Sequence, residues 1–297
     1  MGKTQATLLV FFEYGLTMTI GALVFYLWDS LLPIILEVFV IDVLMTALIF
    51  MFSLGHNNSS VYDPYWSVMP VFLLVLIEPF WYFETVLQTL IAFSVLLWSL
   101  RLTTNWAVRF NGFNEEDFRY VEFREKFNKF YWLISLLAIH LFPTVLVFLG
   151  LLPLMILILY GTPQIAFVTL GSIIIVIGVI VSFVADRQLR LHRETHPYKP
   201  IKSGLWLFSR HPNYLGELCF WYGIALMSAP IGVAYAIVGI IPMTLLFEFY
   251  SIPKMESRTL AKKPGYQNVI DTVPRLLSFP YVVKRVIEQF NPVKKSE

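Results

Sequence analysis

Apolar runs of about 20 residues recur along this chain, and they constrain its fold more than any other feature, because such a run can cross the hydrocarbon core of a bilayer as a helix. Charged residues make up only 14% of the chain and hydrophobic residues 57%. Backbone in lipid must satisfy its own hydrogen bonds, which favours helices. The sequence therefore predicts an all-α, polytopic bundle of about seven or eight transmembrane helices.

Basic residues predict how this bundle is oriented. All of the 22 lysines and arginines except Lys3 lie in residues 101–130, 186–212 and 252–297. Loops rich in Lys and Arg stay on the cytoplasmic side, so we expect these segments and both termini to be cytoplasmic. The expected spans are residues 8–28, 32–54, 66–81, 85–104, 131–150 and 164–185, followed by two short helices within residues 214–251.

One polar stretch interrupts the apolar pattern, "LFSRHPNYLGELCFWYG" at residues 207–223. Ionisable groups inside apolar segments are costly, which makes them functional candidates. It contains Arg210, His211, Asn213, Tyr214 and Glu217. Asn213 and Glu217 lie one helical turn apart and could together bind a carboxamide.

A second polar stretch, "DRQLRLHRETHPYKP", follows the predicted span that ends at residue 185. Asp186, Arg190 and Arg193 share one face if the helix continues. A salt-bridged helix end in water would explain them. Alternatively, arginine forks bind phosphates and an aspartate can hold a ribose hydroxyl.

Two further groups of polar residues precede these stretches. Asp63 lies before Pro64 and between Tyr62 and Tyr65. It is interpreted either as a helix N-cap within an aromatic belt or as part of a tyrosine–carboxyl site that protonates a bound carbonyl. Glu13, in the first span, is expected either to make a helix–helix hydrogen bond or to face a cavity.

The segment "NEEDFRYVEFREKF", residues 114–127, predicts an amphipathic helix on the membrane surface. As an alternative, Arg119 and Tyr120 could contribute to a cytoplasmic ligand site. His192 and His196 are four residues apart without a third ligand nearby, so no metal site is predicted. The charged and apolar segment after Pro253 is typical of a cytoplasmic tail that lies on the membrane.

Together, these motifs make the chain resemble the DUF1295 membrane proteins and the related steroid 5-alpha-reductases. The order of residues that carries the resemblance is Asp186, Arg190, Arg193, Tyr198, Gly204, Asn213, Tyr214, Gly216, Glu217 and Trp221. "SVYDPYW" and "EEDFRYVEFRE" also resemble the DUF1295 pattern. The Gln-Glu pair by which the steroid enzymes hold their ketone has no clear match, so Asp63 with Tyr62, Tyr65 and Glu13 are the catalytic candidates.

This resemblance implies an NADPH-dependent reductase that acts on an activated C=C bond of a membrane lipid such as a 3-oxo-steroid. It implies that the residues from Asp186 to Trp221 named above, with Arg210 and His211, hold the cofactor. We expect a single membrane domain over residues 1–297, with residues 1–110 on the lipid-substrate side and residues 111–280 as the cofactor-binding half. The expected partners are the lipid substrate and the bilayer, without nucleic acid.

Two other functions stay open. The motif RHP-x-Y, followed by "MESRTLAKKPGYQNVIDTVPRLLSFP", resembles the isoprenylcysteine carboxyl methyltransferases, which implies S-adenosylmethionine as the cofactor. The chain could also be a lipid-binding membrane protein without enzymatic activity.

Overall fold

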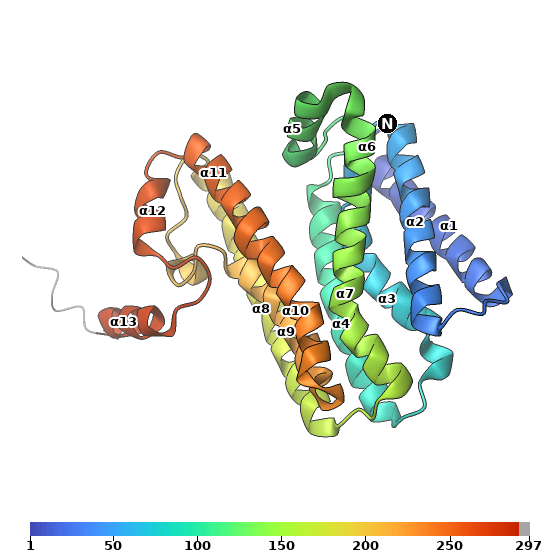
Figure 1. Ribbon diagram of the computed structural model, residues 1–297. Helices are drawn as coiled ribbons and strands as arrows, with labels where there is room; N and C mark the ends of the chain where they lie inside the picture. The colour runs from blue at the N-terminus through green and yellow to red at the C-terminus, as the bar shows by residue number, and fades with distance from the viewer. Residues whose placement is uncertain (291–297) are drawn as a thin grey trace, which may run out of the picture. The chain divides into compact units, whose positions relative to one another are not determined.

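A computed structural model describes residues 1–290 of the chain, and within them every regular element is a helix and no strand occurs (Figure 1). The α-helices are α1 (Lys3–Leu27), α2 (Ile34–His56), α3 (Tyr65–Leu76), α4 (Thr85–Arg109), α5 (Phe118–Phe127), α6 (Tyr131–Ile134), α7 (Phe142–Tyr160), α8 (Ile165–Thr195), α9 (Pro212–Met227), α10 (Val233–Leu245), α11 (Ile252–Lys262), α12 (Tyr266–Thr272) and α13 (Phe279–Phe290). The predicted all-α class is confirmed.

Six helical segments in the described part of the chain are long and apolar enough to cross a membrane. They are Lys3–Leu27, Ile34–His56, Thr85–Arg109, Phe118–Tyr160, Ile165–Thr195 and Val233–Lys262. The predicted span at residues 66–81 corresponds to the shorter helix α3. The two short helices predicted within residues 214–251 correspond to α9 and to α10, which begins the long segment Val233–Lys262. The chain is therefore a multi-pass integral membrane protein, as predicted.

The chain divides into two compact units. The first unit comprises Met1–Ser172 and Ile224–Gly239, and the second comprises Ile173–Gly223 and Ile240–Glu297. Their boundaries fall within α8, α9 and α10.

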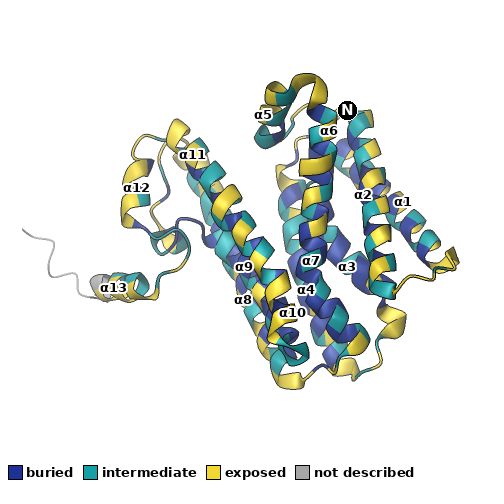
Figure 2. Ribbon diagram, in the orientation of Figure 1, coloured by how far each residue is buried: buried dark blue, intermediate teal, exposed yellow. Residues whose placement is uncertain are grey.

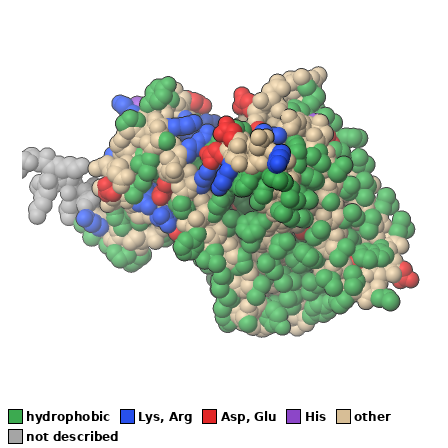
Figure 3. All heavy atoms as spheres, turned by 45° about the horizontal axis from the view of Figure 1, so that its top comes forward, with side chains coloured by type: hydrophobic (Ala, Val, Ile, Leu, Met, Phe, Trp, Pro, Cys, Tyr) green, Lys and Arg blue, Asp and Glu red, His purple; other side chains and the backbone are tan. Residues whose placement is uncertain are grey.

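In the first unit, α1 packs against α2, α3 against α4, and α7 against both α2 and α3. The contact between α1 and α2 is close at Gly21, where any Cβ would clash with the side chain of Met45. Buried and exposed residues alternate around these helices (Figure 2). Apolar side chains cover the visible face of this bundle, and charged side chains gather at the end that bears α5 (Figure 3). Such a surface suits contact with lipid.

Two of the long helical segments that the structure describes each contain a π-helical turn. The segment η4 (Ser135–Leu141) joins α6 to α7, and η7 (Leu246–Ser251) joins α10 to α11. Within η4 the ring of His140 is fully buried, with Nδ1 lying 2.9 Å from the carbonyl oxygen of Ser135 and Nε2 lying 3.0 Å from Ser53 Oγ. π-Helical turns are rare and often occur near functional sites.

In the second unit, small residues bring α8 and α9 together. A Cβ on Gly178 or Gly216 would clash with the neighbouring helix, so both positions require glycine. Ser182 Oγ on α8 donates a hydrogen bond of 3.0 Å to the carbonyl oxygen of Asn213 on α9. The loop between these helices is held on α8 by Trp206, whose indole N–H donates to the carbonyl oxygen of Ala185 at 3.1 Å. These contacts fix the position of the polar stretch at the start of α9.

Candidate functional site

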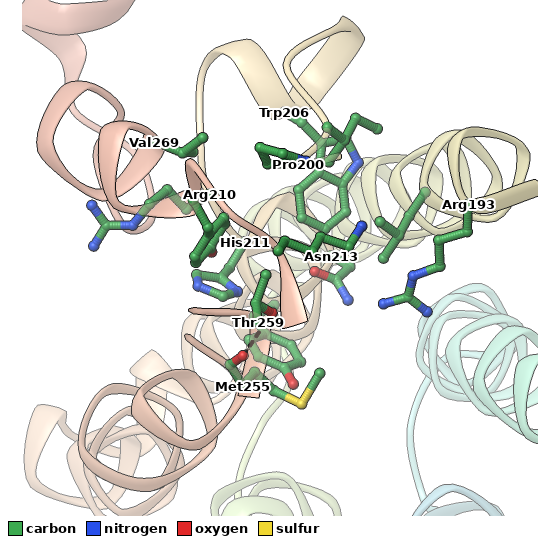
Figure 4. Close-up of a pocket in the computed structure, with 14 residues that line it drawn as sticks. Arg193, Pro200, Trp206, Arg210, His211, Asn213, Met255, Thr259 and Val269 are labelled. Carbon is green, nitrogen blue, oxygen red and sulfur yellow. Dashed lines mark hydrogen bonds between the residues drawn. The ribbon is translucent and has the colours of Figure 1, made fainter. Parts of the chain in front are cut away.

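A cleft lies entirely within the second unit, among α8, the loop that follows it, α9, α11 and α12 (Figure 4). Its lining combines basic, hydroxyl, amide and apolar side chains. The lining residues are Leu189, Arg193, Pro200, Ile201, Trp206, Arg210, His211, Asn213, Tyr214, Met255, Thr259, Lys263, Tyr266 and Val269. Five of the residues predicted to bind the cofactor are among them: Arg193, Arg210, His211, Asn213 and Tyr214.

Asn213, on the first turn of α9, is the polar group in the cleft whose hydrogen bonds are incomplete. Its Nδ2 donates a long hydrogen bond of 3.3 Å to Asp186 Oδ1, while its Oδ1 is buried without any hydrogen-bond partner. A buried acceptor without a partner is costly and calls for an explanation. A ligand that offers an amide N–H or a hydroxyl would complete the bonding of Asn213.

Arg193 and Lys263 supply positive charge to the cleft. Lys263 Nζ donates a hydrogen bond of 2.9 Å to the carbonyl oxygen of Lys199. Burial, with a further contribution from the charge of Arg193, lowers the pKa of Lys263. Two cations close enough to repel each other at a cleft favour an anionic ligand, because the anion would relieve that repulsion.

Arg210 and His211 line the same cleft, but their polar atoms are engaged within its wall. Arg210 donates to Glu256 at 2.8 Å and to the carbonyl oxygens of Ile270 and Val273 at 2.5 Å and 2.8 Å. Figure 4 shows its side chain turned toward the α12 side, away from Asn213. Arg210 therefore holds α11, α12 and the start of α9 together.

His211 contacts the same carboxylate, with Nε2 lying 3.1 Å from Glu256 Oε1. Its ring also stacks on that of Tyr214, with the centroids 5.5 Å apart. Burial lowers the pKa of His211, although the neighbouring Glu256 opposes this effect. The neutral imidazole is therefore favoured, and it orients the Tyr214 ring in the cleft wall.

The other predicted cofactor residues do not line the cleft. Asp186 reaches it only through Asn213, and Arg190 and Tyr198 are exposed. Glu217 and Trp221 are buried deeper along α9. Arg119 and Tyr120 belong to the first unit.

Among the lining residues that were not predicted, three carry a hydroxyl or an ammonium group: Thr259, Lys263 and Tyr266. Burial raises the pKa of Tyr266 to about 12, so its hydroxyl stays protonated. These residues come from α11, the turn after it and the start of α12, more than 40 residues beyond Asn213. The sequence "KKPGY" combines charge with turn formers, but nothing in it indicates which part of the chain it contacts.

In the first unit, Asp63 accepts a hydrogen bond of 2.5 Å from the hydroxyl of Tyr120. Arg119 lies 4.0 Å from the same carboxylate and pairs with Asp117 at 2.7 Å. Burial raises the pKa of Asp63 to about 7, and the charge of Arg119 opposes the shift. Asp63 does not cap α3, whose N-cap is Pro64 without a side-chain hydrogen bond. The tyrosine bonded to Asp63 is thus Tyr120, rather than either of its sequence neighbours.

The hydroxyl groups of Tyr62 and Tyr65 contact residues other than Asp63. The Tyr62 hydroxyl lies 2.8 Å from Thr144 Oγ1, and the Tyr65 hydroxyl donates to Asp42 Oδ1 at 2.8 Å. Their rings stack with centroids 5.1 Å apart. Both tyrosines are almost fully buried, so the interior of the first unit contains two phenol groups beside carboxyl and hydroxyl partners.

Glu13, the remaining catalytic candidate, pairs with His56. Its Oε1 lies 2.5 Å from His56 Nε2, and its Oε2 is buried without a hydrogen-bond partner. The His56 ring stacks on Phe113 with centroids 3.9 Å apart. Glu13 is therefore held at the α1–α2 contact with one oxygen available to a donor.

The helical spans and the polar cleft define a multi-pass membrane protein with a candidate ligand site in its second unit. A family model described as "Protein of unknown function (DUF1295)" matches residues 49–273, which is most of the chain. The protein belongs to the DUF1295 family, in agreement with the resemblance in its motifs. Comparison with curated proteins gave no match, and comparison with solved structures gave none either.

Proposed function

We propose that this protein is a membrane-embedded reductase that uses NADPH to reduce an activated C=C bond of a lipid, such as a 3-oxo-steroid. The observation that carries the proposal is the buried, unpartnered Oδ1 of Asn213 in a cleft that Arg193 and Lys263 make cationic. An amide donor joined to a phosphate would satisfy both features at once.

The fit is best for the nicotinamide half of the cofactor. The cleft is partly open to solvent and has a cavity volume of about 80 Å³, so only part of a dinucleotide would lie inside it. Asn213 would accept from the nicotinamide carboxamide, while Arg193 and Lys263 would hold the pyrophosphate. When bound, NADPH would supply a hydride to the β-carbon of the enone.

Reduction of an enone also needs a group that stabilises negative charge on the carbonyl oxygen and then delivers a proton. The first unit contains tyrosine and carboxyl groups of this kind. The contact between Asp63 and Tyr120 is the strongest candidate, because a carboxyl whose pKa is about 7 can be protonated or ionised near neutral pH. Tyr62, Tyr65 and Glu13 remain candidates for contact with the lipid carbonyl.

A methyltransferase that uses S-adenosylmethionine is the second candidate. The cluster of Arg210, His211 and Glu256 joins the two sequence segments that resemble the isoprenylcysteine carboxyl methyltransferases. Against this function stand Arg193 and Lys263, because S-adenosylmethionine carries a sulfonium cation that two further cations would repel. A lipid-binding role without catalysis is the third candidate.

Ligand binding by the purified protein in detergent tests the proposal. We expect saturable binding of NADPH that free nicotinamide mononucleotide displaces, because both ligands carry the carboxamide and a phosphate. S-Adenosylmethionine should not compete. Asn213→Ala and Glu217→Ala test the site, and the first of these variants should weaken NADPH binding. Tight binding of S-adenosylmethionine without binding of NADPH would reject the reductase in favour of the methyltransferase.

A further inference from the structure

The C-terminal helix α13 presents an apolar face that no described part of the second unit covers. Phe279, Val283, Val286 and Ile287 are all exposed, from 38% for Val286 to 77% for Phe279. Their spacing of i, i+4, i+7 and i+8 places them on one side of the helix. Leu277, just before the helix, is also exposed, at 60%. A contiguous apolar surface of this kind marks a contact with another apolar phase.

The other side of α13 faces the body of the second unit. Tyr281 packs against the cluster formed by Tyr266, Val269 and Val273. Arg285, one turn later, donates a hydrogen bond of 2.8 Å to the Tyr281 hydroxyl. The helix is therefore anchored along one side, and its apolar side points away from that anchor.

A second pocket, of about 210 Å³, lies at this anchored side. It shares Trp206 and Val269 with the cleft of Asn213 but none of the charged residues of that cleft. Lys202 and Arg285 provide positive charge, and Asn268 and Thr272 provide further polar groups. Lys202 Nζ donates to Asn268 Oδ1 at 3.1 Å, which positions the ammonium group. The remaining lining is apolar: Trp206, Leu207, Val269 and Val273. A phospholipid combines a headgroup phosphate with apolar acyl chains, and this lining matches both.

We propose that α13 lies in the interfacial layer of the bilayer and that the pocket beside it binds the phosphate of an anionic phospholipid. Three observations select lipid as the occupant. The apolar stripe belongs to the same unit as the membrane-spanning part of α8. Lys284 and Arg285 lie on the same helix outside the stripe, and basic residues beside an apolar stripe are typical of helices that bind anionic membranes. Lys202 adds a third cation at the headgroup pocket.

The first test measures the depth of α13 in the bilayer. A polarity-sensitive fluorophore is placed at residue 279 by Phe279→Cys in a Cys219→Ser background, and the protein is reconstituted in nanodiscs. We expect quenching by phospholipids brominated near the top of their acyl chains. The matched control is Gln267→Cys, an exposed position on α12, which should not be quenched. Equal and negligible quenching at both positions would overturn the interfacial placement.

The second test measures lipid selectivity. The protein is purified from a membrane with equal amounts of phosphatidylglycerol and phosphatidylcholine, and its retained lipids are quantified by mass spectrometry. Each cation near an anionic surface contributes about 1 kcal/mol, or about fivefold in affinity. We therefore expect Lys202→Gln and Arg285→Gln each to lower the preference for phosphatidylglycerol by about fivefold.

Lys262→Gln is the matched control, because it removes one exposed positive charge on α11 outside this pocket. It should retain the lipid preference of the unsubstituted protein. An unchanged preference in both pocket variants would overturn the headgroup site. NADPH is assigned to the other cleft, so we expect these variants to retain NADPH binding. A failure of the headgroup site would then leave the cofactor proposal unaffected.

Discussion

Arg210 and Glu256 form an ion pair of 2.8 Å in the wall of the candidate cofactor cleft, with each side chain no more than 10% exposed. These residues are 46 positions apart in the chain. The pair connects the start of α9 with α11, and the further bonds of Arg210 reach the end of α12. Arg210, which the sequence predicted to bind the cofactor, thus links three segments of the second unit through its side chain.

We expect Glu256→Ala to destabilise the protein by about 3–5 kcal/mol, because it leaves the Arg210 guanidinium buried without its counter-charge. The measurement is the thermal unfolding of the protein in detergent, followed by the exposure of Cys219 to a thiol-reactive dye. Glu248→Ala is a suitable comparison, since Glu248 is the more exposed of the carboxylates that pair with Arg275. Equal thermal stabilities for the two variants would contradict the structural role of the ion pair.

Asn213→Ala should weaken NADPH binding by about 5- to 150-fold, which corresponds to the loss of about 1–3 kcal/mol for one hydrogen-bonded group. Stability should change by less than about 1 kcal/mol, because the variant also removes a buried acceptor that has no partner. Isothermal titration and thermal unfolding separate the two effects. Gln267→Ala, on the exposed side of α12, is the control. A large loss of stability without loss of affinity would show that Asn213 serves only the fold.

Arg193→Gln and Lys263→Gln should each lower the affinity for NADPH and make it less sensitive to salt. Both cations are assigned to the pyrophosphate, so affinity for NADH should fall by a similar factor. The measurement is the dissociation constant over a series of NaCl concentrations, because exposed charge interactions are screened by salt. If the affinity of either variant equals that of the unsubstituted protein at every salt concentration, that cation is not at the phosphate.

Asp63→Asn should change how stability depends on pH. Burial raises the pKa of Asp63 from 3.8 to about 7, so ionisation costs more in the folded than in the unfolded protein. This cost is absent below about pH 4, grows as pH rises to about 7 and is then constant. The asparagine variant avoids it, so its thermal stability relative to the unsubstituted protein should rise between pH 4 and pH 7. A difference that is the same at both pH values would contradict the shifted pKa.

Much of the helical framework follows from the apolar runs, because hydrocarbon leaves helices as the way to satisfy the backbone. The shorter lengths of α3 and α9 depend on local breaks instead, such as Pro64 before α3 and Pro230 after α9. Within the site, Arg193, Asn213 and Tyr214 could be predicted, because each lies in a short sequence motif on α8 or α9. Lys263 and the true partner of Asp63 could not, since each results from contact between segments that are distant in sequence.

The π-helical turn at Ser135–Leu141 also has a consequence for sequence change. A π turn holds one more residue than an α turn of the same helix. Removing a single residue from this segment would restore regular α-helical geometry without interrupting α7. It would also take away the geometry in which His140 reaches the carbonyl oxygen of Ser135, five positions earlier. The helix would therefore tolerate a one-residue deletion here, but the buried imidazole of His140 would lose the carbonyl oxygen to which it is bonded.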